Sequence, residues 1–407
     1  MKNLLVAQSG GPTVAINSTL MGIYDFARKK VNKIYGARFG IKGLLDENIY
    51  DLSKIIDKSN ISLLSQTPAC ALGSCRQKLK DPNESSEQYE NLIKIFRKYS
   101  INYFIYIGGN DSMDTVSKIS NYLKISGIDD IIIVGAPKTI DNDLFETDHC
   151  PGFGSAAKYI ATTLSELERD CSIYSIPAVT LVEIMGRDAG WLTAASALSR
   201  LNGASGPSLI YCCEKVFDIQ SFFNDIDEKF KQKNNNILIA LSEGICDKNG
   251  KYISEIGFNN YTDEFGHKQN AGAAKILDGF VKKEFGCKVR SIEINTLQRC
   301  AAHIASLTDI KESLKLGEKA AECALNDMCG EMSTIIRKSN DPYQVEYKSA
   351  PANLVANRTK RLPDGMISES GNDVTIQAIE YLKPLIQGEL KIQYQNGIPV
   401  HADLFQT

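Results

Sequence analysis

The chain reads Tyr-Phe-Ile-Tyr-Ile at residues 103–107 and continues as Gly-Gly-Asn-Asp-Ser at residues 108–112. A second apolar run, at residues 131–136, leads into Pro-Lys-Thr-Ile-Asp-Asn-Asp at residues 137–143. Glycines let backbone amides approach a phosphate, carboxylates hold magnesium or accept a proton, and a lysine neutralises developing charge. Two buried strands that end in such loops therefore predict phosphoryl transfer to a hydroxyl group.

Short apolar runs alternate with amphipathic stretches along the rest of the chain, which is typical of a parallel α/β architecture. We expect further strands at residues 4–7, 178–184, 237–241, 289–294 and 334–337. We expect helices near residues 14–30, 113–126, 155–170, 188–201, 271–285, 298–307 and 309–327. Because 407 residues exceed what one hydrophobic core usually serves, two domains are expected.

The composition argues against several classes of protein. A net charge of −3 gives no reason to expect a nucleic-acid partner. The eleven cysteines follow no ligand spacing and the four histidines are scattered, which favours reduced thiols in a cytoplasmic protein over a zinc site. No apolar stretch approaches the about 18 residues that a membrane span needs, so no membrane association is expected.

Six short motifs follow one another in the order seen in 6-phosphofructokinases. They are Ser9-Gly10-Gly11, Gly73-Ser74-Cys75-Arg76, residues 108–112, residues 137–143, Met185-Gly186-Arg187 and Gln298-Arg299. The chain resembles this family over roughly residues 1–330, and the remainder, including residues 384–389, is similar to the tail of its diphosphate-dependent branch. The resemblance implies α/β architecture with two Rossmann-like three-layer domains, mostly parallel sheets and an active site in the interdomain cleft. It also implies Mg²⁺-dependent phosphoryl transfer to the 1-hydroxyl of fructose 6-phosphate.

The resemblance also implies which part of the chain forms each domain. Residues 1–153, completed by a segment near 298–330, are expected to form the diphosphate-binding domain. Residues 154–297 are expected to bind the sugar phosphate, and residues 330–407 to form an extension that packs on the domains.

Asp141 is the best candidate for the general base. A sugar hydroxyl is a poor nucleophile, and a carboxylate within hydrogen-bond reach can take its proton as the bond to phosphorus forms. By resemblance, Asp141 is this proton acceptor, with Thr139 and Asp143 beside it. The alternative is an Asp-Asn-Asp turn that merely caps a helix.

Arg187 follows a predicted strand and a glycine, so its guanidinium can reach a phosphoryl group as a fixed and always charged fork. The resemblance implies that Met185, Gly186 and Arg187 contact the sugar and that the arginine stabilises the transferring group. A solvated or ion-paired arginine at a strand end is the alternative.

The resemblance assigns the remaining residues to two groups. The donor-binding residues are Gly10, Gly11, Arg76, Gly108, Gly109, Asn110 and Ser112, and Asn110 is expected to bind magnesium together with Asp111. The sugar-binding residues are Thr139, Ile140, Asp141, Glu243, Arg290, Thr296 and Arg299, with both arginines at the 6-phosphate. The alternatives are turn packing for the glycines and surface charge for the arginines.

Two positions bear on the phosphoryl donor. ATP-using members of the family carry glycine where this chain has Asp111 and Lys138. Asp111 puts a carboxylate where the α-phosphate of ATP would lie, and like charges repel strongly in a partly dry site. Lys138 supplies a cation near the transferring group, which suits a small donor without adenosine. Both residues therefore favour diphosphate and are expected to take part in catalysis.

Three positions depart from the family pattern. Asn110 replaces an acid that helps to bind magnesium, and Thr296 replaces a histidine or tyrosine near the acceptor. Ala178 stands where many members have an arginine that reaches the sugar phosphate from a neighbouring subunit. These changes favour a small, less regulated oligomer, a homodimer or homotetramer.

The sequence therefore predicts a cytoplasmic, diphosphate-dependent enzyme that forms fructose 1,6-bisphosphate reversibly in glycolysis. Three alternatives stay open: an ATP-dependent member of the family, a catalytically silent regulatory subunit that binds sugar phosphate, and a related acceptor such as sedoheptulose 7-phosphate. The basic run at residues 357–361 is expected to face solvent rather than the 6-phosphate.

Overall fold

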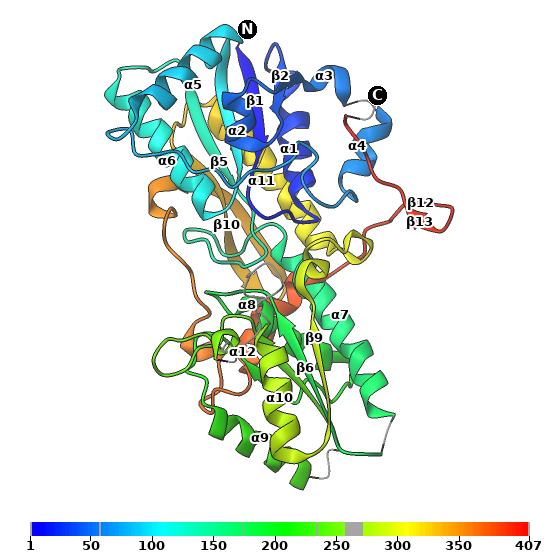
Figure 1. Ribbon diagram of the computed structural model, residues 1–407. Helices are drawn as coiled ribbons and strands as arrows, with labels where there is room; N and C mark the ends of the chain where they lie inside the picture. Colours follow the sequence, from blue (N-terminus) through cyan, green and yellow to red (C-terminus); the bar gives the residue numbers. More distant parts are fainter. Residues whose placement is uncertain (1, 57, 174, 233–234, 257–271, 406–407) are drawn as a thin grey trace, which may run out of the picture. The chain divides into compact units, whose positions relative to one another are not determined.

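The structure, a computed structural model, describes residues 2–56, 58–173, 175–232, 235–256 and 272–405. The chain forms two compact units, called unit 1 and unit 2 (Figure 1). Unit 1 comprises residues 1–155, 299–359 and 386–407, and unit 2 comprises residues 156–298 and 360–385. Residues 330–407, expected to form an extension that packs on the domains, belong partly to unit 1 and partly to unit 2.

Unit 1 contains a seven-stranded sheet with the order β11-β10-β5-β4-β1-β2-β3. Its strands are β1 (Asn3–Gln8), β2 (Ile34–Ala37), β3 (Ile49–Asp51), β4 (Ile101–Gly108), β5 (Ile132–Pro137), β10 (Glu331–Asn340) and β11 (Tyr343–Pro351). The pairs from β2 through β1, β4 and β5 to β10 are parallel, whereas β3 and β11 are antiparallel edge strands. The carboxyl ends of β1, β4 and β5 therefore meet at one edge of the sheet, which brings together the loops that follow them.

Helices cover both faces of this sheet, as expected for parallel strands that are almost wholly apolar. The helices of unit 1 are α1 (Ile16–Ala27), α2 (Gly40–Leu45), α3 (Leu52–Ile55), α4 (Lys58–Leu64), α5 (Ser86–Lys98), α6 (Asn110–Ile125) and α11 (Leu307–Leu325). Along β1, Leu4 and Val6 pack with α1 and α11, while Leu5 and Ala7 pack with α2, α5 and α6. The three layers are visible in the unit that contains both chain ends (Figure 1).

Helices α1 and α11 approach each other closely at two glycines. A Cβ added to Gly22 would lie 1.9 Å from the carbonyl oxygen of Leu314, and one added to Gly317 would lie 2.1 Å from that of Thr19. We expect Gly22→Ala to lower the free energy of unfolding by about 1–3 kcal/mol, because the two backbones have to separate. Urea unfolding measures this change.

The matched control is Gly279→Ala in α10 (Ala273–Phe285), where an added Cβ meets nothing within 4 Å. This substitution should raise stability by roughly 0.5–1 kcal/mol, because glycine is a poor helix former. Equal effects of the two substitutions would contradict the close approach of α1 and α11.

Unit 2 is built on a four-stranded parallel sheet with the order β7-β8-β6-β9. Its strands are β6 (Ala178–Ile184), β7 (Leu209–Tyr211), β8 (Asn236–Ser242) and β9 (Lys288–Glu293). Its helices are α8 (Trp191–Ala195), α9 (Ile219–Lys231), α10, α12 (Ile376–Leu382) and most of α7 (Phe153–Ser172). Helices α9 and α10 share one apolar cluster with β6, β7 and β8.

Short elements complete the fold. Strands β12 (Tyr394–Gln395) and β13 (Ile398–Pro399) form a separate antiparallel ribbon. The 3₁₀ helices are Ser196–Asn202, Ile253–Glu255, Asn295–Arg299, Ala302–Ile304, Ala352–Leu354, Asp364–Met366 and Lys383–Ile386.

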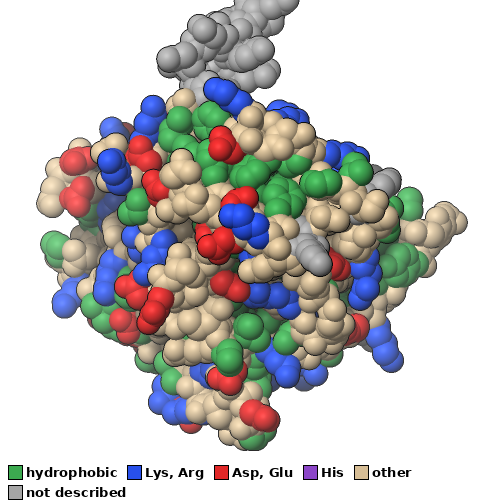
Figure 2. Space-filling model, turned by 90° about the horizontal axis from the view of Figure 1, so that it is seen from below, with side chains coloured by type: hydrophobic (Ala, Val, Ile, Leu, Met, Phe, Trp, Pro, Cys, Tyr) green, Lys and Arg blue, Asp and Glu red, His purple; other side chains and the backbone are tan. Residues whose placement is uncertain are grey.

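In the part of the chain that the structure describes, no helix combines the length and the apolar character of a membrane span. On the face drawn in Figure 2, basic and acidic side chains are interspersed.

The predicted fold class, α/β with mostly parallel sheets, is confirmed. Two predicted helices differ in detail. The helix expected at residues 188–201 is divided into α8 and a 3₁₀ helix. The one expected at residues 298–307 is replaced by two 3₁₀ turns before α11, whose start is fixed by Ser306 Oγ accepting from the amide of Asp309. The helix expected at residues 271–285 is observed from Ala273, and Ala271 lies outside the described residues.

Candidate active site

In unit 1, the Gly10–Gly11 turn after β1 is flanked by two basic side chains. Gly10 has φ +77°, and a Cβ there would lie 3.0 Å from Nζ of Lys138. A Cβ on Gly11 would lie 3.2 Å from a guanidinium nitrogen of Arg299. Larger side chains would therefore crowd both cations. The amide of Gly10 donates to the carbonyl oxygen of Cys75, so the turn offers the amide of Gly11 and positive charge to an anion.

Lys138 is the first residue after β5 and is only 2% exposed. Its Nζ donates to the carbonyl oxygen of Gly11 at 2.6 Å, and its backbone amide donates to Gly108 at 2.9 Å. Burial lowers the pKa of Lys138, while the nearby carboxylates of Asp141 and Asp143 oppose this effect. The ammonium is thus a dry cation held at the ends of β1, β4 and β5.

The loop that carries the predicted general base is tied down by its own residues and by the segment before α7. The amide of Asp141 donates to Oγ1 of Thr139 at 3.1 Å. The amide of Thr139 donates to Pro151 at 3.2 Å, and Asn142 Oδ1 accepts from the amide of Cys150 at 3.0 Å. The predicted sugar contact Ile140 is buried, whereas Asp141 is half-buried. The carboxylate of Asp141 therefore extends from a braced loop.

The start of α6 carries the predicted donor residues that follow β4. Gly109 is the N-cap, and Ser112 Oγ hydrogen-bonds to Ser9 Oγ from the first loop. Nδ2 of Asn110 donates to Asp143 Oδ2 at 3.3 Å and to the carbonyl oxygen of Arg358 at 2.8 Å. The Asn110 amide thus joins α6 to the Asp143 loop and to the segment after β11.

Two further basic residues lie at this end of α6: Lys78, which sequence reasoning missed, and Arg358 of the basic run. Lys78 forms an ion pair with Asp111 at 2.6 Å, and this hydrogen bond raises the pKa of Lys78. Arg358 is exposed, as expected for the basic run, and its guanidinium lies 4.0 Å from the ring of Phe145. The predicted donor residue Arg76 is exposed and makes no hydrogen bond or ion pair with a described residue. Only chain folding pairs Lys78 with Asp111, because their spacing carries no local signal.

In unit 2, the Met-Gly-Arg motif follows β6 and meets the end of β8. The amide of Gly186 donates to Glu243 Oε1 at 3.1 Å, and its carbonyl oxygen accepts from Ser242 Oγ at 2.6 Å. The amide of Met185 donates to the side chain of Gln298 at 3.4 Å. Arg187 is exposed and has no hydrogen-bond or ion-pair partner among the described residues. The structure thus brings Met185, Gly186 and Glu243 together and leaves the Arg187 guanidinium accessible to a ligand.

A further carboxyl group, missed from the sequence, lies on β6. Glu183 Oε2 accepts from the amide of Ala274 at 2.8 Å at the start of α10. Burial raises the pKa of Glu183 to about 7, and the charges of Glu293 and Glu243 add to this effect. Unit 2 therefore contains a carboxyl group that titrates near neutral pH.

The three remaining sugar-binding candidates are divided between the two units. Arg290 is in register with Thr180 in the first half of β6 and pairs with Asp170 at 3.2 Å, away from the carboxyl end that carries Arg187. Thr296 is exposed in the 3₁₀ helix after β9. Arg299 belongs to unit 1, where it lies beside Gly11.

The acidic residues of unit 1 can be tested for their fit to magnesium. Within the described ranges, no three His, Cys, Asp or Glu side chains cluster as a metal site. Mg²⁺ commonly takes one or two carboxylates and completes its shell with water and phosphate oxygens. Asp111, which follows Asn110 in the chain, and Asp143, which accepts from the Asn110 amide, fit this pattern when the donor brings the other ligands.

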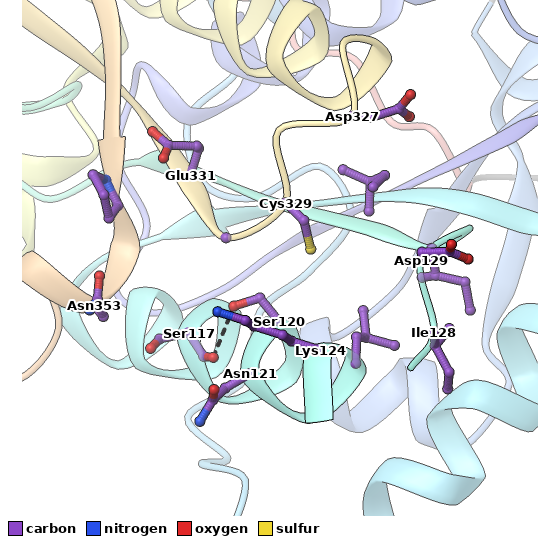
Figure 3. A pocket seen from close by; sticks show the side chains of 15 residues that line it. Ser117, Ser120, Asn121, Lys124, Ile128, Asp129, Asp327, Cys329, Glu331 and Asn353 are labelled. Carbon is purple, nitrogen blue, oxygen red and sulfur yellow. Dashed lines mark hydrogen bonds between the residues drawn. The ribbon is translucent and has the colours of Figure 1, made fainter. Parts of the chain in front are cut away.

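A pocket of about 620 Å³ lies elsewhere in unit 1 (Figure 3). It is lined by the second half of α6, the start of β5 and the turn before β10, and it includes none of the predicted site residues. Its charged lining consists of Asp129, Asp327 and Glu331 against Lys124. An excess of carboxylates makes this pocket unsuitable for diphosphate.

Comparisons with known proteins agree on one family. The family model described as Phosphofructokinase matches residues 3–293. A pyrophosphate–fructose 6-phosphate 1-phosphotransferase of Halomonas elongata is 41% identical over 99% of this chain and 96% of its own length. The enzyme of the same name from Xanthomonas campestris is 40% identical over 99% and 96%. The crystal structure of a pyrophosphate-dependent phosphofructokinase from Nitrosospira multiformis superposes with a TM-score of 0.87 at 38% identity, covering 99% of this chain and 96% of the other.

Proposed function

Since the chain belongs to the phosphofructokinase family, we propose that it transfers a phosphoryl group reversibly from diphosphate to the 1-hydroxyl of fructose 6-phosphate. The products are fructose 1,6-bisphosphate and phosphate. The observation that carries this proposal is the buried Lys138 ammonium, 2.6 Å from the Gly11 carbonyl oxygen and electrostatically coupled to Asp141. A cation and a carboxylate at one end of the sheet suit charge neutralisation beside proton removal.

The donor is assigned to the loops of unit 1. The amide of Gly11 and those at the start of α6 can donate to diphosphate oxygens, whereas the amide of Gly10 donates to the carbonyl oxygen of Cys75. Lys138 and Arg299 flank the turn and neutralise the anion, and the accessible Arg76 can add a third cation. These groups all bind phosphate oxygens, which suits diphosphate, a small donor without adenosine.

The transfer itself requires one base and one leaving group. Asp141 takes the proton of the 1-hydroxyl as that oxygen forms its bond to the transferred phosphorus atom. The bond between this phosphorus and the bridging oxygen breaks, and phosphate leaves with the bridging oxygen. Lys138 and Arg187 stabilise the charge on the phosphoryl oxygens during this exchange.

The acceptor is assigned to the residues after β6 and β8. Glu243 is proposed to accept hydrogen bonds from sugar hydroxyls through the carboxylate oxygen that the Gly186 amide leaves free. Met185 and Gly186 shape the loop, and Arg187 reaches the transferring group. Arg290 and Arg299 are retained as candidates for the 6-phosphate, with Thr296 beside the acceptor.

Magnesium is proposed as the cofactor, held by Asp111 with Asn110 and Asp143 beside it. Bound Mg²⁺ supplies charge neutralisation for the diphosphate oxygens. The contribution of this chain is to present carboxylates close to the donor loops. We also propose that the protein is cytoplasmic and forms a homodimer or homotetramer. Light scattering of the purified protein measures the oligomeric state.

Arg187→Lys tests the role of the guanidinium fork. Lysine keeps the charge but loses the paired donors, so kcat/KM for fructose 6-phosphate should fall about 10- to 100-fold, or about 1.4–2.7 kcal/mol. Steady-state kinetics measures this change. Arg169→Lys, at an exposed position near the end of α7, is the matched control. A loss of the same size in both variants would contradict the role of Arg187.

The reverse reaction distinguishes an enzyme from a silent sugar-phosphate-binding subunit. Purified protein is incubated with fructose 1,6-bisphosphate, phosphate and Mg²⁺, and diphosphate formation is followed by ³¹P NMR. We expect a diphosphate signal that requires all components. Binding of fructose 1,6-bisphosphate without any diphosphate formation would instead favour the silent subunit.

A further inference from the structure

A row of charged side chains lies inside unit 1, next in sequence to the loop of the general base. Its members, joined end to end, are Arg337, Asp148, His149, Glu312 and Tyr343. They come from β10, from the segment before α7, from α11 and from β11. His149 is 2% exposed and Glu312 is 6% exposed, so the centre of the row is shielded from water.

His149 is the central link, and the geometry sets its protonation state. Its Nδ1 lies 2.8 Å from Asp148 Oδ1, and its Nε2 lies 2.6 Å from Glu312 Oε2. Because ionised carboxylates only accept hydrogen bonds, both ring nitrogens have to carry a proton. Burial by itself lowers the pKa of His149, but Glu312 and Asp148 together raise it to about 9.

The row continues into the segment that braces the predicted general base. The amide of Asp148 donates to Ile335 at 2.8 Å, and the amide of Ile335 donates to Thr147 Oγ1 at 3.0 Å, which fixes this segment on β10. Two residues after His149, the carbonyl oxygen of Pro151 accepts from the amide of Thr139. Thr139 in turn accepts from the amide of Asp141.

The same helix that holds His149 also holds the far end of this segment. Asp309 lies three residues before Glu312 on α11 and accepts from the amide of Gly152 at 2.9 Å and from that of Ser155 at 3.0 Å. Residues 147–152 are therefore fixed on β10 at Thr147 and Asp148 and on α11 at His149 and Gly152, and the Thr139 contact at Pro151 lies between the two α11 contacts.

We propose that His149 is a positioning residue of the phosphoryl-transfer reaction: as an imidazolium between Asp148 and Glu312, it fixes residues 147–152 and thereby the Thr139–Asp141 loop. This inference rests on the proposed function, since it concerns the orientation of the proposed base. His149 itself touches neither Thr139 nor Asp141, and acts through the backbone that leads to Pro151.

A pH dependence follows from this arrangement. The pKa of His149 in the fold is raised above its ordinary value near 6.5. The ion pairs of His149 with Asp148 and Glu312 are therefore fully present below pH 6.5 and are lost as pH rises through about 9. The other titratable and charged groups around His149 and Glu312 are Asp148, Arg337, Tyr343, Asp309 and Tyr347. We expect kcat to decrease on the alkaline side with an apparent pKa near 9.

Glu312→Gln separates positioning from mere support of the fold. Removing one of the two carboxylates lowers the pKa of His149, so the alkaline decrease in kcat should shift by at least one pH unit toward neutrality, with activity recovered at pH 6. His149→Gln should lower kcat at least tenfold while KM for diphosphate changes less than threefold, because the donor loops are unchanged. His303→Gln, at an exposed position, is the control and should match the parent protein.

Hydrogen exchange keeps the test independent of turnover. In His149→Gln, the amides of Thr139 and Asp141 should exchange at least tenfold faster than in the parent protein, while amides in the centre of β1 stay protected. If His149→Gln does not fold, Glu312→Gln and Tyr343→Phe carry the same measurement. Unchanged exchange together with an unshifted pH profile in Glu312→Gln would overturn the inference. Faster exchange in a protein that is inactive with diphosphate would support the positioning and reject the proposed reaction.

Discussion

Replacing Asp141 by asparagine is expected to lower kcat by about 10³-fold, or about 4 kcal/mol of transition-state stabilisation. Asparagine has nearly the same shape, so the loop held by Thr139 and Pro151 should keep its conformation. The amide cannot take the proton of the 1-hydroxyl, and the oxygen then has to attack without a base. KM for fructose 6-phosphate should change only a few-fold. Initial rates across a range of both substrates measure these quantities.

Glu146→Gln provides the matched control, because Glu146 is an exposed carboxylate shortly after the same loop. It should retain the parent rate. Asp141 would not be the base if Asp141→Asn kept more than a tenth of the parent kcat and Glu146→Gln kept the parent rate. Asp143, the other acidic residue of the loop, would then be the next residue to replace.

The second large effect is expected from Lys138→Met. Methionine is neutral and of similar length, so it removes the ammonium that donates to Gly11 with little change in volume. Loss of one buried donor that faces developing charge typically costs about 10²- to 10³-fold in rate. We therefore expect kcat/KM for diphosphate to fall by this factor, with a smaller change in KM for fructose 6-phosphate.

Thermal unfolding and a surface control accompany this measurement. Lys138 is buried with a lowered pKa, so its removal relieves a desolvation cost and should not unfold the protein. Lys124→Met, at an exposed position on α6, should leave the kinetics unchanged. A Lys138→Met variant with full diphosphate activity would remove Lys138 from the site.

The central strands of the fold could be predicted because they are continuous apolar runs. Strand β4 and the following α6 are the clearest case, with Gly108 and Gly109 between them. The edge strand β11 was harder to predict. In β11, Glu346 and Lys348 alternate with half-buried residues, so the strand has no apolar run to recognise. It is the pairing with β10 that makes it a strand.

The sequence indicated which loops carry the candidate site but not which of their side chains lie close together. The resemblance indicated Gly10, Gly11 and Lys138, but only the strand order β5-β4-β1 brings the lysine to the turn. The same reasoning assigned Arg290 and Arg299 to the 6-phosphate, which stays a prediction: Arg290 pairs with Asp170 in unit 2, and Arg299 lies beside Gly11 in unit 1. Proximity between residues far apart in the chain depends on topology, which local patterns do not encode.

The buried row around His149 illustrates the same limit. His149 and Glu312 are separated by 163 positions, and neither has an unusual sequence neighbourhood. A lone histidine beside an aspartate is most often a structural residue. Its second carboxylate partner, Glu312, becomes apparent only when α11 packs against the segment before α7.

The most direct measurement is fructose 1,6-bisphosphate formation by the purified protein from fructose 6-phosphate and Mg²⁺, with diphosphate and ATP as parallel donors. We expect product with diphosphate and at least a hundredfold lower kcat/KM with ATP, because Asp111 is proposed to oppose a nucleotide and Lys138 to serve the smaller donor. Equal or faster turnover with ATP would contradict this account of the donor site, and no product with either donor would contradict the proposed function.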